Sequence, residues 1–469
     1  MSPAALPPDD ALRHLPPDDA LRHLPPDDAL RRLPPDDALR RVLHDEVHAR
    51  PPARLALPTG VLYLAVFNDG VSRQAELDLL RLLPGQERLT LLDLQDNFLR
   101  LALPGYTLKW ERHSEFTRYS LVLPMHAEPA GWFEGEPWNL QRLLPEDWLA
   151  QVPGRTFCAI ELALLQADLT QPQALLEQMR PNFGEHTLAA SLMGNQRHSM
   201  VLTDFRLRPS GFERMLVLAA PDTTETRAGR IVQRLLEVET YRLLALRGVP
   251  TAKDLAPELA QAEAQLAQIT ADLEHNQQSD QALLDTLVAL AARVEKAIAQ
   301  HSYRFSATRA YDALAAQRIT ELRETPVPGT QTIGEFMRRR LSPAMATVAA
   351  TEQRLLGLPE RISRASALLR TRVDIATEGQ NQQLLEKLTR GQALQLRLQS
   401  TVEGLSIAAI SYYVISLLLY AAKAVEKAGV PIQPEIAVGA LIPVVLYGVW
   451  RTVRRIHEKL RGADSDAAH

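Results

Sequence analysis

The chain has 469 residues, which is too long for one compact core, so two or more domains are expected. Hydrophobic residues make up 46% of it and charged residues 23%, a composition typical of folded proteins that excludes a wholly disordered chain. The formal net charge of −4 excludes a chain-wide basic surface, so we predict no nucleic-acid partner.

The N-terminal segment is a tandem repeat. Residues 6–41 contain four copies of a nine-residue unit that reads Leu-Pro-Pro-Asp-Asp-Ala-Leu-Arg, followed by His or Arg. A unit of nine residues is too short to be a folding module, and each Pro-Pro pair stops the turn before it. We therefore predict that residues 1–43 form a low-complexity, disordered tail, with a docking peptide as the alternative.

Residues 44–220 have the mixed pattern of an α/β domain. Short apolar runs between turn-forming residues predict strands at 61–67, 106–112, 116–123, 156–165, 187–193, 200–206 and 212–217. Helical spacing predicts a helix at 72–83, and residues 132–148 are expected to form a loop with a capped turn. Cys158, the only cysteine, lies in an apolar run, so we interpret it as a core residue; it excludes an internal disulfide bond.

Residues 221–403 are rich in good helix formers and are predicted to be almost entirely helical. A first helix is expected to end near residues 248–250, and helices at 255–274 and 280–324 follow, the second capped by Asp280. After a break at 326–329, the segment 332–400 contains Pro343 and Pro359 and is expected to kink or divide there. Helices of this length must pack on one another, so we predict an antiparallel bundle or coiled-coil stalk and, as one possible partner, a second copy of the chain.

Two uncharged apolar segments follow the helical region, at residues 405–422 and 436–450. The first is long enough to span a bilayer, and the second is long enough if its flanking residues lie at the interface. We predict a transmembrane hairpin at 404–452, with a buried core hairpin as the alternative. The predicted anchor residues, which would contact lipid, are Ile407, Ile410, Val414, Leu418, Val444 and Trp450.

The charges around these segments predict an orientation. Five basic side chains follow the second segment closely, namely Arg451, Arg454, Arg455, Lys459 and Arg461, whereas the connector at 423–435 balances two lysines against two glutamates. Positive charge favours the cytoplasmic side, so we expect both termini and the 44–220 domain in the cytoplasm, with the protein in the inner membrane. The predicted fold class is thus α+β, with a helical stalk and a membrane anchor.

Several separated motifs resemble one family. They lie at residues 45–51, 110–116, 203–206, 229–237, 303–306, 368–374 and 399–406. With these motifs the chain resembles the bacterial membrane-anchored family called domain of unknown function 3422, over about residues 43–460. The resemblance implies this architecture and membrane anchoring, and it supplies no catalytic residues.

One polar cluster is a candidate for chemistry. If residues 110–116 form a strand, then Glu111, His113 and Glu115 lie on one face, where they could bind a cation or transfer protons. A solvated strand face with ion pairs requires only the same residues. His44 and His48 have the spacing of two zinc ligands on a helix, but a polar contact explains them equally. Since no catalytic motif is present, we predict no enzyme activity and no cofactor.

Two main classes of function stay open, besides an enzyme that would use the face of Glu111, His113 and Glu115. The first is a membrane-anchored scaffold or regulatory protein with unknown protein partners. The alternative is an ion channel, because the order of parts is similar to that of CorA-type magnesium channels, and Ser406, Ser411, Tyr412 and Ser416 would provide a polar pore-lining face. Those channels carry Gly-Met-Asn at the end of the first membrane helix, where this chain has residues 420–423, Tyr-Ala-Ala-Lys, which puts magnesium selectivity in doubt.

Overall fold

The structure is a computed structural model that describes residues 37–40, 43–44, 54–125, 138, 140–145, 147–275, 278–427 and 433–466, with side chains as far as 455 except at 142–143. Most of the tail predicted at 1–43 and much of the loop predicted at 132–148 lie outside these residues. The chain divides into two compact units, which are described separately: Met1–Ala264 with Ala292–Leu358, and Gln265–Ala291 with Pro359–His469.

A nine-stranded sheet, formed by the described residues, is the centre of the first unit. Its strand order is β2-β3-β4-β1-β5-β8-β7-β6-β9, and among its pairs only β5 and β8 run parallel. The strands are β1 (Thr59–Phe67), β2 (Phe98–Leu103), β3 (Tyr106–Arg112), β4 (Phe116–Pro124), β5 (Arg155–Gln166), β6 (Ala189–Met193), β7 (Ser199–Thr203), β8 (Glu213–Ala219) and β9 (Thr325–Pro326). Sheet and long helices together confirm the predicted α+β class.

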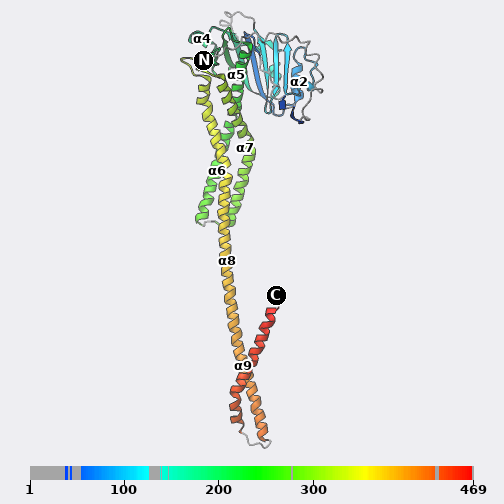
Figure 1. Cartoon of the computed structure of the whole chain (residues 1–469), viewed down its shortest axis with the longest axis vertical. Helices are drawn as coiled ribbons and strands as arrows, with labels where there is room; N and C mark the ends of the chain where they lie inside the picture. Colours follow the sequence, from blue (N-terminus) through cyan, green and yellow to red (C-terminus); the bar gives the residue numbers. More distant parts are fainter. Residues whose placement is uncertain are drawn as a thin grey trace, which may run out of the picture. The chain divides into compact units, whose positions relative to one another are not determined.

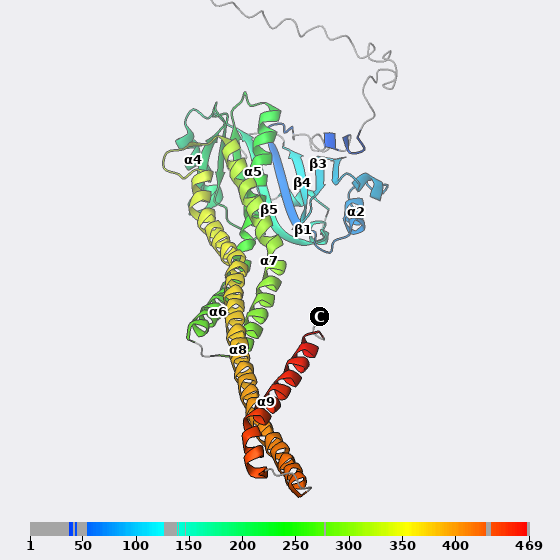
Figure 2. The ribbon, with the colours of Figure 1, turned by 60° about the horizontal axis from the view of Figure 1, so that its bottom comes forward.

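One face of the sheet packs against α5 (Glu225–Leu246), as Figures 1 and 2 show. The core there joins side chains of the central strands, such as Tyr63 and Ile160, to Ile231 and Leu235 of the helix. The apolar residues of α5 recur at helical spacing, so one stripe of the helix is buried against the sheet. Its N-cap is Thr224, whose hydroxyl accepts a hydrogen bond from the Arg227 amide.

The opposite face is covered by α2 (Arg73–Arg81), α4 (Pro172–Met179) and the short 3-10 turns that follow β4. Trp110, Tyr119 and Trp148 are fully buried there, and the Trp148 indole donates to the carbonyl of Leu79. Both faces of β1 are therefore covered, which explains why its sequence is an uninterrupted apolar run rather than an alternating one.

All seven predicted strands are found, six of them with shifted ends and the one at 106–112 with the predicted ends, and among the described strands and α-helices three were missed. Strand β7 ends at Thr203 instead of residue 206 because Phe205 adopts a left-handed φ of 51°, which no extended ladder can continue. The missed elements are β2, α4 and β9. Strand β2 carries charge within a short edge segment, α4 is only eight residues long, and β9 is a two-residue pairing made by tertiary contact.

The helical region contains α5, α6 (Gly248–His275), α7 (Asp280–Leu322), α8 (Ile333–Lys427) and α9 (Pro434–Asp466). Helix α6 begins seven residues before its predicted start. The predicted cap of α7 was wrong by one residue: the hydroxyl of Ser279 accepts a hydrogen bond from the Ala282 amide, and Asp280 is already helical.

Helix α8 does not divide at either proline, contrary to one of the two predicted outcomes. It is one helix of 95 residues, and it also continues through the predicted boundary between stalk and hairpin at 403/404. Buried side chains flank both prolines, namely Leu341 and Met345 around Pro343, and Leu358 and Ile362 around Pro359. Their packing offsets the hydrogen bond that each proline removes.

Gly154, in the turn before β5, provides a test of how closely this turn packs against the end of β1. Its φ is +113°, and a Cβ atom would lie 2.3 Å from the backbone oxygen of Phe67 at the end of β1. Gly154→Ala is expected to lower the free energy of unfolding by about 2–3 kcal/mol, measured by urea titration. The matched control is Gly85→Ala: its φ is +74° but no atom lies within 4 Å of the added Cβ, so about 1 kcal/mol is expected. Equal losses would show that the close approach to Phe67 has no effect.

Candidate functional site

The predicted row of Glu111, His113 and Glu115 does not form. Strand β3 ends at Arg112, and the next three residues make the turn to β4, so strand alternation does not reach His113 or Glu115. The side-chain amide of Asn68 donates to the His113 carbonyl at 2.9 Å and holds this turn. The His113 ring stacks on Phe116 with centroids 4.4 Å apart, and Glu115 pairs with Arg304 of α7.

Glu111 belongs instead to a buried ion-pair network. Its carboxylate accepts two hydrogen bonds from Arg118, at 2.5 and 2.9 Å, and lies 3.1 Å from the Lys109 ammonium. Burial alone would raise the pKa of Glu111, but Arg118 and then Lys109 outweigh it and hold that pKa at about 2. Arg118 also lies 3.8 Å from Glu237 of α5, so the network ties two strands to the helix above them.

A second buried cluster joins β8 to α5. Glu213 and Glu239 share the Arg242 guanidinium, which pairs closely with Glu239 and lies 3.8 Å from Glu213. Burial, and after it the neighbouring Glu239 carboxylate, raises the pKa of Glu213 to about 9, so this carboxyl group is protonated at neutral pH. Burial likewise raises the pKa of the Cys158 thiol well above its usual value, which supports its interpretation as a core residue.

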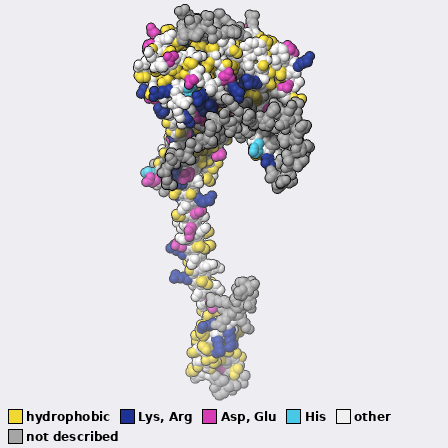
Figure 3. Space-filling model, turned by 45° about the horizontal axis from the view of Figure 1, so that its top comes forward, with side chains coloured by type: hydrophobic (Ala, Val, Ile, Leu, Met, Phe, Trp, Pro, Cys, Tyr) yellow, Lys and Arg dark blue, Asp and Glu magenta, His cyan; other side chains and the backbone are white. Residues whose placement is uncertain are grey.

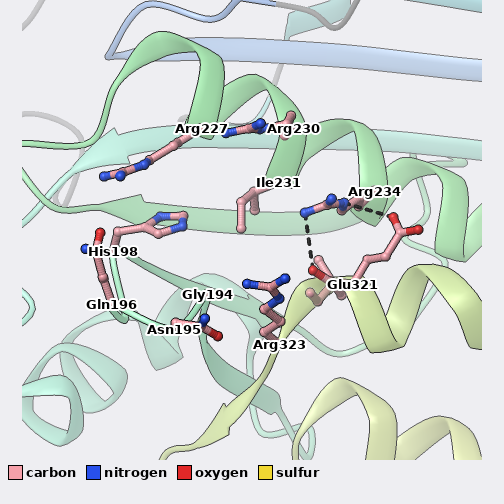
Figure 4. A pocket seen from close by; sticks show the side chains of 11 residues that line it. Gly194, Asn195, Gln196, His198, Arg227, Arg230, Ile231, Arg234, Glu321 and Arg323 are labelled. Atoms are coloured by element: carbon pink, nitrogen blue, oxygen red, sulfur yellow. Dashed lines mark hydrogen bonds and ion pairs between the residues drawn. The ribbon is translucent and has the colours of Figure 1, made fainter.

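A polar cavity of the first unit is lined by arginines, and we call it the arginine pocket (Figure 4). Its volume is about 400 Å³. It lies where the β6–β7 turn, the first turns of α5 and the end of α7 meet. Its lining residues are Gly194, Asn195, Gln196, His198, Arg227, Arg230, Ile231, Arg234, Glu321, Leu322 and Arg323.

Local conformation positions these side chains. Gly194 has a φ of +77°, a conformation that favours glycine, and a Cβ there would lie 2.6 Å from Nε2 of His198, so a larger residue would displace the ring. On α5 the three arginines follow at positions 227, 230 and 234, a helical spacing that places them along one side. Arg323 follows the last residue of α7 with a left-handed φ of 52°.

Charge in the arginine pocket is only partly balanced. Arg234 donates to the Glu321 carboxylate at 3.1 Å and to its carbonyl at 3.2 Å, the two dashed lines in Figure 4. Within the described part of the chain, the side chains of Arg227, Arg230 and Arg323 have no hydrogen-bond or ion-pair partner. Burial, and then Arg227, lowers the pKa of His198 despite the opposing effect of Asp222. The pocket therefore presents unpaired positive charge and a neutral imidazole.

Comparison with known proteins agrees with the resemblance seen in the sequence. The family described as "Protein of unknown function (DUF3422)" matches residues 35–460. The chain belongs to this family. The match confirms the family that the sequence motifs predicted. It covers every described element of this DUF3422 protein from β1 through most of α9. No curated protein and no solved structure matches the chain.

In this DUF3422 protein the predicted anchor residues lie on two apolar helices. Helix α8 and the part of α9 at Pro434–Arg455 each contain an eighteen-residue window, with mean hydropathy 1.9 and 1.7, and only 6% of each window is buried. Ile410 is 45% exposed, Val444 64% and Trp450 42%, whereas Ile407, Val414 and Leu418 are half-buried. Figure 3 shows hydrophobic side chains at the surface of the segment that carries α9. By length and composition alone, both helices could cross a membrane.

The structure describes only one of the two histidines that the sequence offered as zinc ligands. His44 is exposed and His48 lies outside the described residues. Among the residues that the structure describes, no group of three or more His, Cys, Asp or Glu could hold a metal ion. The arginine pocket itself was missed. The 227, 230, 234 spacing was visible in the sequence, but His198 and Arg323 join it only through the fold.

Proposed function

We propose that this DUF3422 protein is a membrane-anchored scaffold or regulatory protein, whose apolar parts of α8 and α9 cross the bilayer as a hairpin. The observation that carries the proposal is the exposure of those helices, since only 6% of each apolar window is buried. Monomeric soluble proteins rarely expose continuous apolar surface of this length, and burying it in lipid is favourable. A core hairpin, the alternative, would bury most of both windows.

Side chains at the end of the second window fit a membrane interface. Arg454 lies over the Trp450 ring at 5.2 Å, and Tyr447 lies 5.9 Å from the same ring. Aromatic rings next to basic residues are typical of the headgroup region. Arg451, Arg454 and Arg455 follow the second apolar segment directly, which favours a cytoplasmic C-terminus and, with a short connector, a cytoplasmic sheet domain.

The scaffold role rests on the exposed apolar side chains of α8 ahead of the membrane segment. Residues 373–402 of this helix carry exposed Leu384, Leu385, Leu388, Leu394 and Leu398. An isolated helix with such a surface gains stability by packing on a partner, and a second copy of the chain presents the same surface. For the channel alternative the expected pore-lining residues differ in exposure: Tyr412 is 68% exposed, whereas Ser411 is only 2% exposed.

Replacing Ile407, Ile410, Val414 and Leu418 together with aspartate is expected to release the protein from membranes. Each aspartate near the centre of a membrane helix costs about 2.5–3.5 kcal/mol, so four exceed what one apolar segment gains by insertion. Flotation on a sucrose gradient measures the result, since membranes float and aggregates sink.

The matched control places four aspartates on the same helix, at Leu384, Leu385, Leu388 and Leu394. This variant is expected to float with the membranes as the unsubstituted protein does. The anchor proposal is wrong if the first variant still floats, and it is equally wrong if both variants leave the membrane fraction.

A further inference from the structure

We propose that the arginine pocket binds the terminal phosphate group of a phosphorylated compound. This function is independent of the membrane anchor, because every residue that lines the pocket belongs to the first unit. Neither the sequence patterns nor the family match assigns a ligand to this place.

The charge balance is the first argument. Four arginines line one cavity, whereas Glu321, the only carboxylate among the described lining residues, is already bonded by Arg234 and by Arg318. Asp222, in the connection between β8 and α5, raises the pKa of His198 by its charge. It forms no described ion pair with the guanidinium groups of Arg227 and Arg230. Like charges held together repel one another, so a polyanion that enters the pocket is strongly favoured.

The type of side chain indicates the type of anion. A guanidinium group presents N–H donors in a planar fork that matches two phosphate oxygens at once. Arg227 and Arg230 approach the cavity from one wall and Arg323 from another, as Figure 4 shows. Arg227 lies in the first turn of α5, where the helix dipole adds positive potential, although Glu225 is the acidic residue of the same turn.

The size of the cavity indicates that the phosphate carries a further group. The cavity of about 400 Å³ is many times larger than the roughly 30 Å³ that one water molecule occupies in the liquid, so it has room for more than one small group. The rest of the lining is suited to a polar group: Asn195 and Gln196 are exposed at the β6–β7 turn, and the neutral His198 ring forms one wall. A phosphate ester or an anhydride such as pyrophosphate satisfies both requirements.

Two sources share this chemistry, a soluble phosphate compound and a phospholipid with a terminal phosphate. Isothermal titration of the full chain in non-ionic detergent separates them with two probes. Pyrophosphate represents the soluble source, and dihexanoyl phosphatidic acid, which dissolves as monomers, represents the lipid head group. Binding of at least one probe in 150 mM NaCl is expected, and the probe that binds more tightly identifies the source. Binding of neither probe would overturn the proposal.

The decisive variant is Arg230→Gln with Arg323→Gln, which removes two unpaired cations from different walls of the pocket. The dissociation constant of the bound probe is expected to rise at least tenfold in this variant. The matching double lysine variant keeps the charge but not the planar fork, so its dissociation constant is expected to lie between those of the unsubstituted protein and the glutamine variant. The control is Arg88→Gln with Arg206→Gln, two exposed arginines outside the pocket. An equal loss in the control pair would mean that the anion responds to overall charge only, and the site would be rejected. Melting temperatures of all variants check that each is folded.

Discussion

Replacing Arg118 with alanine is expected to lower the free energy of unfolding of the sheet domain by about 3–5 kcal/mol, because a buried carboxylate loses its partner. Arg118 is buried and makes two hydrogen bonds to Glu111, which is itself buried. Without the guanidinium group, Glu111 retains only Lys109. Urea titration followed by tryptophan fluorescence measures the loss, since Trp110 and Trp148 are buried in this domain.

A double-mutant cycle separates this coupling from the loss of packing. Glu111→Ala combined with Arg118→Ala is expected to cost clearly less than the sum of the two single substitutions, because neither charge is then left alone. The matched control is Arg180→Ala, which breaks an exposed pair with Glu177 and is expected to cost less than about 1 kcal/mol. Strictly additive losses in the cycle would contradict the network.

The Glu213 carboxyl group is expected to make stability depend on pH. Its pKa lies at about 9 in the folded protein and at about 4.5 when the chain is unfolded, so between these values the folded state binds the extra proton. Stability therefore falls as pH rises from about 4.5 to about 9. Glu213→Gln keeps a hydrogen-bond donor without a titrating proton, so this part of the slope disappears. The difference in free energy of unfolding between the variant and the unsubstituted protein is therefore expected to shift in favour of the variant by about 1 kcal/mol or more between pH 5 and pH 8.5.

Urea midpoints at several pH values between 5 and 9 provide this measurement. The control is Glu185→Gln, which removes an exposed carboxylate of the same domain and is expected to leave the slope unchanged. Parallel pH profiles for Glu213→Gln and the unsubstituted protein would show that Glu213 is ionised in the fold, contrary to its assignment as a protonated carboxyl group.

The candidate site was the part least accessible from the sequence. The pattern Glu111, His113, Glu115 indicated a possible metal or proton-transfer site, but a turn begins after Arg112 and ends the strand alternation. Glu111 pairs with Arg118 of the next strand, and Glu115 pairs with Arg304 of α7. The arginine pocket combines residues more than a hundred positions apart, such as His198 and Arg323. Spacing along the chain reveals only neighbours on one element, so Arg227, Arg230 and Arg234 were the only detectable part.

Local patterns determined the elements and the composition of their faces. Apolar runs bounded by turn residues indicated most strands, the helix formers after residue 223 indicated the helices, and uninterrupted apolar length indicated two segments able to span a bilayer. These features depend on short-range sterics and on hydrophobicity, which each segment carries by itself. Only the tertiary structure decided the strand order, the two-residue strand β9, the continuity of α8 through two prolines and the meeting of four arginines. Each of these depends on contacts between distant segments, whose energies no single segment contains.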